Sequence, residues 1–128
     1  MRIRPTSGAV MASFLTLDRA VKAMLSAQAE FVRFNQRTDI PSPVMIRAGI
    51  HKGPTVVVTL NGRLDYFGTT VNEAARIEGQ CVENQLLLSA AVMESASVKT
   101  HLDGFAVESF ETALKGLGKS YRLYRVKL

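Results

Sequence analysis

Three polar side chains near the middle of the chain have types and spacing that suit an anionic ligand. Asn72 and Arg76 lie four residues apart, so they share one face if the segment is helical. Asp65 precedes them, just before the turn residue Gly68. An amide and a fixed planar cation above a turn can bind negatively charged oxygen atoms. The pattern therefore predicts an anion-binding site in this part of the chain.

The residues around this group predict the elements that position it. Residues 64–67 are expected to form a short strand, and Gly68 can adopt the backbone angles of a sharp turn. Thr69 or Thr70 is expected to cap a helix over residues 71–78. The side chains of this helix that are expected to face a core are Val71, Ala74 and Ala75.

Hydrophobic patterning divides the rest of the chain into further strands and helices. Thr16 is expected to cap a helix over residues 17–35, whose apolar residues recur at helical spacing. Asn61 and Gly62 are typical of a hairpin turn. The other expected elements are strands over residues 9–15, 44–50, 55–60, 86–88, 105–110 and 121–126, and a helix over residues 90–95 capped by Ser89. Because hairpins and helices are mixed, the sequence predicts one α+β domain over residues 1–128.

Composition restricts the class of protein. Sixteen Lys and Arg against eleven Asp and Glu give a formal net charge of +5, which suits a solvated basic surface or one that attracts nucleotides. No basic run is interleaved with aromatic residues, so we expect no nucleic-acid partner. Cys81 is the only cysteine, which excludes an internal disulfide and agrees with a cytoplasmic location. No stretch of the sequence is long enough to cross a membrane.

Several motifs together resemble the class III nucleotidyl cyclase domain, the adenylate and guanylate cyclase family. The motifs are Gly-Ile-His-Lys-Gly-Pro at residues 49–54 and the segment 64–78, which contains Asp65, Asn72 and Arg76. Weaker traces lie upstream at residues 9–14 and downstream at residues 114–116. Their order and spacing fit the family over most of the chain. The resemblance implies a ferredoxin-like cyclase fold with a mixed, mostly antiparallel sheet and helices packed on it.

The resemblance also implies a reaction and its partners. Family members convert ATP or GTP into a cyclic nucleotide and pyrophosphate, with two divalent ions, Mg²⁺ or Mn²⁺, on the phosphates. The ribose 3′ oxygen attacks the α-phosphate. The active site forms between two domains paired head to tail, as a homodimer or with another cyclase domain. The product implies a role in intracellular signalling.

Roles for individual residues follow from the same resemblance. Asp65 matches the position that reads the purine, where a carboxylate favours adenine and therefore ATP. Asn72 matches the amide that orients the ribose, and Arg76 matches the arginine that stabilises charge on the phosphates. Lys115 falls in the segment where the family has a phosphate-binding lysine. The position of a second lysine holds Leu117, and Lys119 comes two residues later. His51 is given a structural role.

The chain departs from the family at the metal-binding half of the site. Gly8 stands where the resemblance places a metal-binding aspartate, and the strand that carries the other aspartate has no counterpart in the sequence. We therefore expect no metal ligands in this chain and interpret it as the C-terminal part of a catalytic domain, without the N-terminal strand and helices. As an isolated chain it is expected to be inactive and to have open strand edges that favour self-association.

Other functions remain open on the sequence alone. A degenerate cyclase-like domain would bind a nucleotide or a regulatory partner without chemistry, and Gly8 favours that alternative. A plain α+β dimerisation module is the third alternative. His101 is expected on the surface, and the residues expected to fill the core are Met11, Met24, Met45 and Met93.

Overall fold

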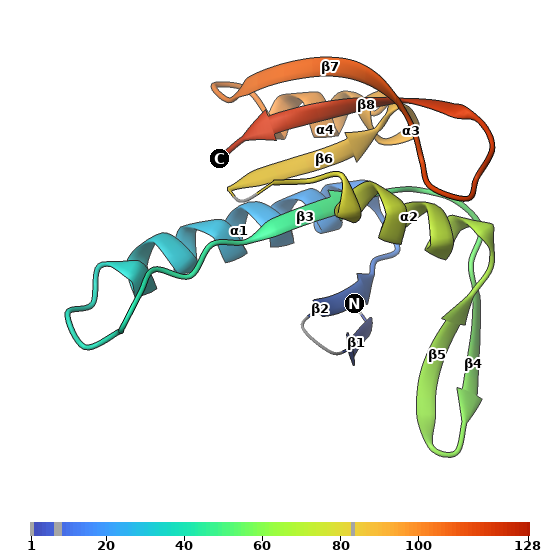
Figure 1. The fold of residues 1–128 in the computed structure, drawn as a ribbon, viewed down its shortest axis with the longest axis horizontal. Coiled ribbons are helices and arrows are strands. Elements are labelled where there is room, and N and C mark those ends of the chain that lie inside the picture. Colours follow the sequence, from blue (N-terminus) through green and yellow to red (C-terminus); the bar gives the residue numbers. More distant parts are fainter. Residues whose placement is uncertain (1, 7–8, 83) are drawn as a thin grey trace.

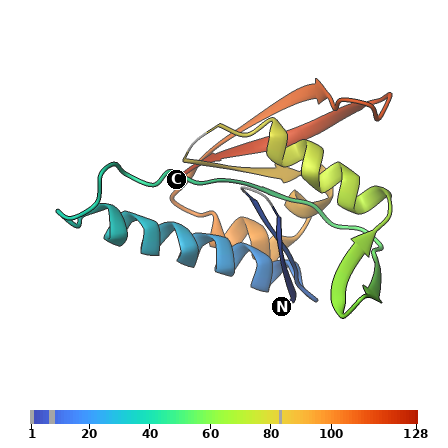
Figure 2. The same cartoon turned by 60° about the horizontal axis from the view of Figure 1, so that its bottom comes forward.

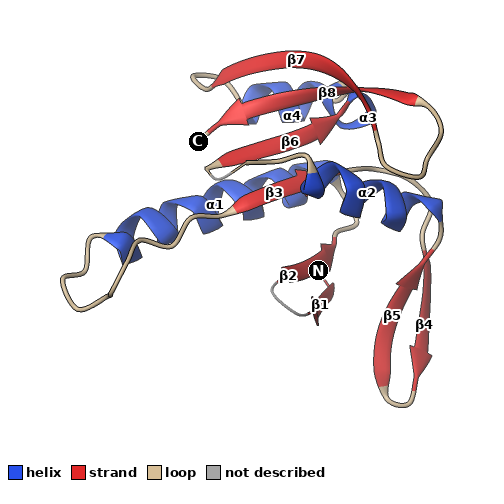
Figure 3. Cartoon of the chain, in the orientation of Figure 1, coloured by secondary structure: helices blue, strands red, loops and turns tan. Residues whose placement is uncertain are grey.

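The computed structural model describes residues 2–6, 9–82 and 84–128, with the backbone alone for residues 2–6, 60 and 63–66. This part of the chain contains eight strands and four helices, which are mixed along the sequence (Figure 3). The strands are β1 (Arg2–Thr6), β2 (Ala9–Ser13), β3 (Arg47–Ile50), β4 (Val56–Leu60), β5 (Arg63–Phe67), β6 (Gln85–Ser89), β7 (Ala106–Ala113) and β8 (Ser120–Lys127). The helices are α1 (Leu17–Asn35), α2 (Thr69–Gly79), α3 (Ala90–Met93) and α4 (Ala96–His101).

Four of the strands form the main sheet, in the order β3-β6-β8-β7. The β3–β6 pair is parallel and the other two pairs are antiparallel. Strands β1 and β2 form a separate hairpin, as do β4 and β5. Among the described residues, β3 pairs with β6 alone, so its other edge carries no strand. This mixed sheet confirms the α+β prediction.

Helices cover both faces of the main sheet (Figures 1 and 2). Because side chains alternate along a strand, Leu86 and Leu88 of β6 point to one face and Leu87 points to the other. The first face packs against α1, α3 and α4 through Val21, Val92 and Val98. The second face packs against α2 through Ile77. The site residues on α2 therefore rest on a fully buried apolar layer.

Helix α1 begins and ends at the predicted residues, Leu17 and Asn35. The Thr16 side chain accepts a hydrogen bond from the backbone N–H of Arg19 (3.2 Å), which caps the helix as expected. Towards the other end of the helix, Val32 and Phe34 are exposed.

The structure describes no helix that is both long enough and apolar enough to cross a membrane.

Helix α2 lies unusually close to β3, and a glycine makes this possible. A Cβ added at Gly49 would lie 2.8 Å from the backbone nitrogen of Glu78 and 3.1 Å from Cγ2 of Ile77. Real Cβ atoms do not approach a backbone this closely, so only glycine fits between the strand and the helix. Gly49, the first residue of the motif at residues 49–54, thus sets the distance between β3 and the helix that carries Asn72 and Arg76.

The β4–β5 hairpin projects away from the main sheet (Figure 1). Asn61 and Gly62 have φ values of 52° and 75°, which confirms the predicted turn. The side chains of Val56, Val57 and Phe67 are 60%, 38% and 46% exposed. The hairpin therefore presents apolar surface outside the core of the domain.

Several sequence predictions are corrected by the structure. Neither Thr69 nor Thr70 caps α2, because the helix begins at Thr69 after an N-cap glycine with no side-chain capping bond. Ala75 faces solvent rather than a core. Met45 is 46% exposed and fills no core. His101 is half-buried, and its Nε2 lies 2.5 Å from Oδ1 of Asp18. Strand β1 and helix α4 were not predicted at all.

Candidate functional site

Helix α2 presents Asn72 and Arg76 on its outer side. Gly68 precedes the helix with a φ of 123°, a conformation that favours glycine. Both polar side chains are exposed, one turn apart, while Ile77 on the opposite side of the helix is fully buried. The predicted sharing of one helix face is therefore observed.

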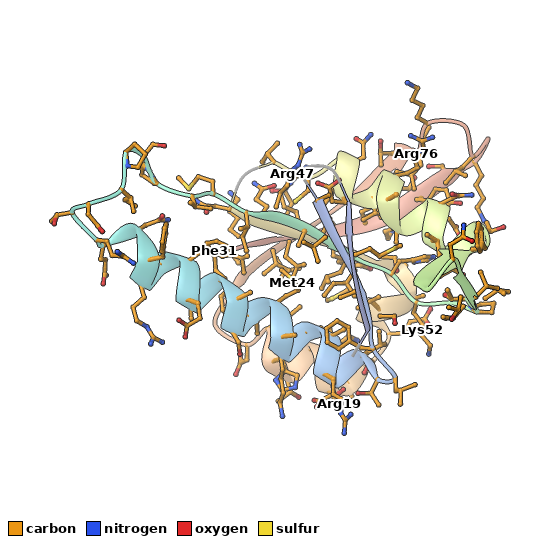
Figure 4. The ribbon with its side chains drawn as sticks, turned by 90° about the horizontal axis from the view of Figure 1, so that it is seen from below. Arg19, Met24, Phe31, Arg47, Lys52 and Arg76 are labelled. Carbon is orange, nitrogen blue, oxygen red and sulfur yellow. The ribbon has the colours of Figure 1, made fainter. Side chains whose placement is uncertain are left out.

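Arg76 lies beside the loop that joins β7 and β8 (Figure 4). A hollow of about 150 Å³ between this loop and α2 is lined by Ala75, Arg76, Gly79, Gln80 and Lys115. It contains two cationic side chains and an amide. The nearby carboxylate of Glu78 is turned to Arg47 instead, with Arg47 Nε 2.7 Å from Glu78 Oε1. Among the described side chains neither Arg76 nor Lys115 forms an ion pair, so the hollow offers positive charge to an anion.

The size of the hollow decides how much ligand it can hold. Sites for drug-sized ligands measure about 300–1,000 Å³, so this hollow is too small to enclose a nucleotide. It has room for part of one, such as a phosphate group. A nucleotide bound here would remain largely uncovered by this chain unless a second surface closed over it.

A network of hydrogen-bonding side chains lies beneath the first half of α2. The Tyr121 hydroxyl donates to Oε2 of Glu73 at 2.6 Å. The other carboxylate oxygen, Oε1, lies 3.4 Å from Nε2 of His51. Nδ1 of His51 lies 2.8 Å from Oγ of Ser89. We call Ser89, His51, Glu73 and Tyr121 the Glu73 network.

The surroundings of Glu73 favour its charged form. Its side chain is 13% exposed. The hydrogen bond from Tyr121 holds the pKa of Glu73 below its ordinary value of 4.5 against the opposing effect of burial, and His51 and Lys119 add to the lowering. Burial raises the pKa of Tyr121, and its hydrogen bond to Glu73 raises it further. Glu73 is therefore a carboxylate throughout the neutral range.

The lowered pKa of Glu73 predicts a dependence of stability on pH. Because the folded pKa lies below the ordinary value of 4.5, the stabilisation is fully present above that pH and is lost as the pH falls through the folded pKa. We expect Glu73→Gln to lower the free energy of unfolding by about 1–3 kcal/mol at pH 7 and by much less near pH 3. Urea unfolding across this range measures the difference. Glu30→Gln, at an exposed residue of α1, is the control. An equal loss at both pH values would contradict the prediction.

The other residues predicted for the site are placed as follows. Asp65 lies in β5 opposite Val58, three residues before Gly68, and only its backbone is described. Leu117 is half-buried and packs against the buried cluster on the α2 side of the sheet. Nζ of Lys119 lies 4.9 Å from the centre of the Tyr121 ring. Gly8 lies outside the described residues.

The Glu73 network was not predicted from the sequence. Glu73 lies four residues before Ile77, so the two share the buried face of α2. An acid at a core-facing position was the signal that could have revealed it. Ser89 was predicted as a helix cap, but its side chain makes no capping bond and contacts His51 instead. The structural role expected for His51 agrees with this contact.

Metal binding needs a cluster of ligands that the described side chains do not form. No group of three or more His, Cys, Asp or Glu residues gathers anywhere in the described part of the chain. The described residues therefore do not fit a two-metal centre by themselves. The positive charge of Arg76 and Lys115 suits an anionic ligand instead.

Comparison with known proteins gives one family. The profile of the adenylate and guanylate cyclase catalytic domain matches residues 7–126, nearly the whole chain. No curated protein matches the chain at a significant level.

Solved cyclase structures share the fold. The guanylate cyclase domain of RhGC from Catenaria anguillulae, solved with GTP, is 25% identical, with a TM-score of 0.65 over 87% of this chain and 59% of that one. A guanylyl cyclase is 24% identical, with a TM-score of 0.76 over 98% of this chain and 68% of its own. The adenylyl cyclase CyaB from P. aeruginosa is 22% identical, with a TM-score of 0.67 over 97% and 70%. The chain thus spans 59% of the first of these proteins.

Proposed function

Because the chain belongs to the family of adenylate and guanylate cyclase catalytic domains, we propose that it acts in a paired domain that forms cyclic AMP and pyrophosphate from ATP. In this reaction the ribose 3′ oxygen loses its proton and bonds to the α-phosphorus. The bond from that phosphorus to the bridging oxygen breaks, and pyrophosphate leaves. The cyclic product would serve intracellular signalling.

The observation that carries this proposal is the hollow shared by Arg76 and Lys115. Charge that develops on the phosphates during the reaction is stabilised by donors that are already in place. Arg76 can offer several N–H donors in one plane, and Lys115 adds a second positive charge from the β7–β8 loop. Asn72, one turn earlier on the same helix face, would hold the ribose.

Two divalent ions, Mg²⁺ or Mn²⁺, belong to the chemistry of the family. When bound, they neutralise phosphate charge and polarise the reacting oxygens. The described residues of this chain do not form their site, and its sequence has Gly8 where the resemblance places an aspartate. We therefore assign to this chain the binding and orientation of the sugar and phosphates, and no step that passes through a metal ion.

Pairing with a second cyclase domain, head to tail, is part of the proposal. The hollow is too small to enclose a nucleotide, so another surface must complete the site. The projecting β4–β5 hairpin exposes apolar side chains that a partner would cover, and the residues concerned are Val56, Val57 and Phe67. The partner is a second copy of this chain or another cyclase domain.

A second candidate function is nucleotide binding without chemistry, as a regulatory domain. Two observations favour it: Gly8 stands at the position of the aspartate, and Leu117, at the position of the second lysine, is half-buried against the apolar cluster. Such a domain would keep Asn72 and Arg76 as binding residues only.

Formation of product distinguishes these functions. The chain is incubated with ATP or GTP and Mn²⁺, alone and together with a cyclase domain that carries both metal-binding aspartates, and the cyclic product and ATP binding are both measured. The first function predicts cyclic AMP as the main product of the pair. ATP binding without product in the pair supports the regulatory domain instead. Neither binding nor product would exclude both.

Asp65 is proposed to set the preference for adenine. A carboxylate accepts a hydrogen bond from the adenine amino group, and guanine offers a carbonyl oxygen at that position. We expect Asp65→Ala to lower the ratio of ATP to GTP affinity about tenfold, the effect of one lost hydrogen bond to a charged group. Calorimetric titration with each nucleotide measures the ratio. Asp103→Ala, at an exposed residue after α4, is the control. A ratio that Asp65→Ala leaves unchanged would remove this role.

A further inference from the structure

The first half of α2 is held to the sheet differently from its second half. Ile77, in the second half, is fully buried in the apolar cluster on this side of the sheet. The first half has no side-chain cap and no acidic residue in its first turn to interact with the helix dipole. Asn72 belongs to this half. Its position therefore depends on whatever else ties the start of the helix to the sheet.

Glu73 provides such a tie to two separate strands. Its Oε2 accepts the hydrogen bond from Tyr121 of β8 at 2.6 Å, and its Oε1 faces Nε2 of His51, the residue after β3, at 3.4 Å. His51 in turn contacts Ser89 at the end of β6. The network thus reaches three adjacent strands of the main sheet from one residue of α2.

Burial makes these contacts effective as a positioning device. The side chains of His51 and Glu73 are 11% and 13% exposed, so water competes weakly for their hydrogen bonds. A hydrogen bond to a charged group is among the stronger contacts of a protein interior. Glu73 lies directly after Asn72 and three residues before Arg76, so a rotation or shift of the helix at Glu73 moves both site residues.

We propose that Glu73 and Tyr121 are positioning residues, which hold α2 so that Asn72 and Arg76 meet the nucleotide together. Neither residue is assigned a contact with the ligand. The inference rests on the proposed function for the identity of the ligand. The attachment of the helix to the sheet by Glu73 and Tyr121 can be tested without any ligand.

The first test is a mutant cycle between Tyr121 and the two site residues of α2. Tyr121→Phe removes only the hydroxyl, and we expect it to raise the Kd for ATP about tenfold. In a background that carries both Asn72→Ala and Arg76→Ala the same substitution is expected to change the Kd less than about twofold, because Tyr121 acts through these two residues. The same loss in both backgrounds would show a general effect on the domain and would overturn the proposal.

Tyr124→Phe is a matched control on the same strand. Tyr124 also lies on β8, but its side chain packs against the other face of the sheet, away from α2. The Kd for ATP is expected to stay unchanged in this variant.

Glu73→Gln keeps the shape of the side chain and an oxygen that can accept a hydrogen bond from Tyr121. It should therefore lose less affinity for ATP than Glu73→Ala. Equal losses in the two Glu73 variants would count against the hydrogen bond as the cause.

Amide hydrogen exchange separates a failure of this inference from a failure of the proposed function. If Arg76→Ala binds ATP as the parent does, the proposed nucleotide site is wrong. In Tyr121→Phe the exchange rate of the α2 amides should still rise about tenfold relative to the rate of the α1 amides. The reason is that the start of α2 is released from the sheet. Unchanged exchange in α2 would overturn the positioning role whatever the ligand.

Discussion

Replacement of Arg76 by alanine is expected to lower formation of cyclic nucleotide by about 100-fold or more when the chain is paired with a cyclase domain that supplies the metal ligands, the usual cost of removing a donor that stabilises charge in a transition state. ATP binding without turnover should weaken about tenfold, since one charged hydrogen-bonding partner of the phosphates is lost. Arg76→Lys should fall between parent and alanine variant, because it keeps the charge but not the planar set of donors. Product assays and calorimetry measure these two quantities.

Arg33→Ala is the control for the loss of positive charge. Arg33 is exposed on α1, where it pairs with Glu30, and α1 covers the face of the sheet opposite α2. A loss of ATP affinity in this variant would point to a general effect of net charge. Equal ATP affinity in the parent and in Arg76→Ala would instead remove Arg76 from the site.

Replacement of Gly49 by alanine is expected to lower the free energy of unfolding by about 1–3 kcal/mol, the usual cost of adding a carbon atom to a packed interior. The new Cβ would meet the backbone of Glu78 at 2.8 Å, and a backbone cannot rotate away as a flexible side chain can. Helix α2 would have to move from β3. ATP affinity should therefore fall together with stability.

Gly79→Ala is the matched control for this substitution. Gly79 is the last residue of α2, and a Cβ there would meet nothing within 4 Å. Because alanine favours a helix, stability should stay equal or rise by up to about 1 kcal/mol. Urea unfolding of both variants gives the comparison. If Gly49→Ala were as stable as Gly79→Ala, the close approach of α2 to β3 would not be a constraint on the fold.

The sequence predicted the elements whose signals are local. Thr16 at the start of α1 and Asn61-Gly62 in the β4–β5 turn act within a few residues of themselves, and both were found as expected. Strand β1 and helix α4 lack such signals. Arg2–Thr6 is a five-residue strand containing a proline, and the six residues of α4 are too few for a helical hydrophobic pattern.

The candidate site was predictable only where one helix carries it. The spacing of Asn72 and Arg76 defined a shared face, and the structure shows that face. Arg76 and Lys115 line the same hollow although they lie almost forty residues apart in the chain. Only the family resemblance predicted that both belong to the site. Glu73 and Tyr121 belong to no motif, and their contact depends on how α2 lies on the sheet. A core-facing acid such as Glu73 indicates a buried partner, but a single sequence does not show which residue that partner is.

The β4–β5 hairpin connects any partner on its exposed surface to the proposed nucleotide site. One of its ends joins the segment of His51, and the other joins Gly68 and the start of α2. A partner that fixes the hairpin would therefore also restrict α2. The two binding events would then share a coupling free energy, and thermodynamics requires this coupling to be reciprocal. A partner that tightens ATP binding by a given factor would itself be held more tightly, by the same factor, once ATP is bound.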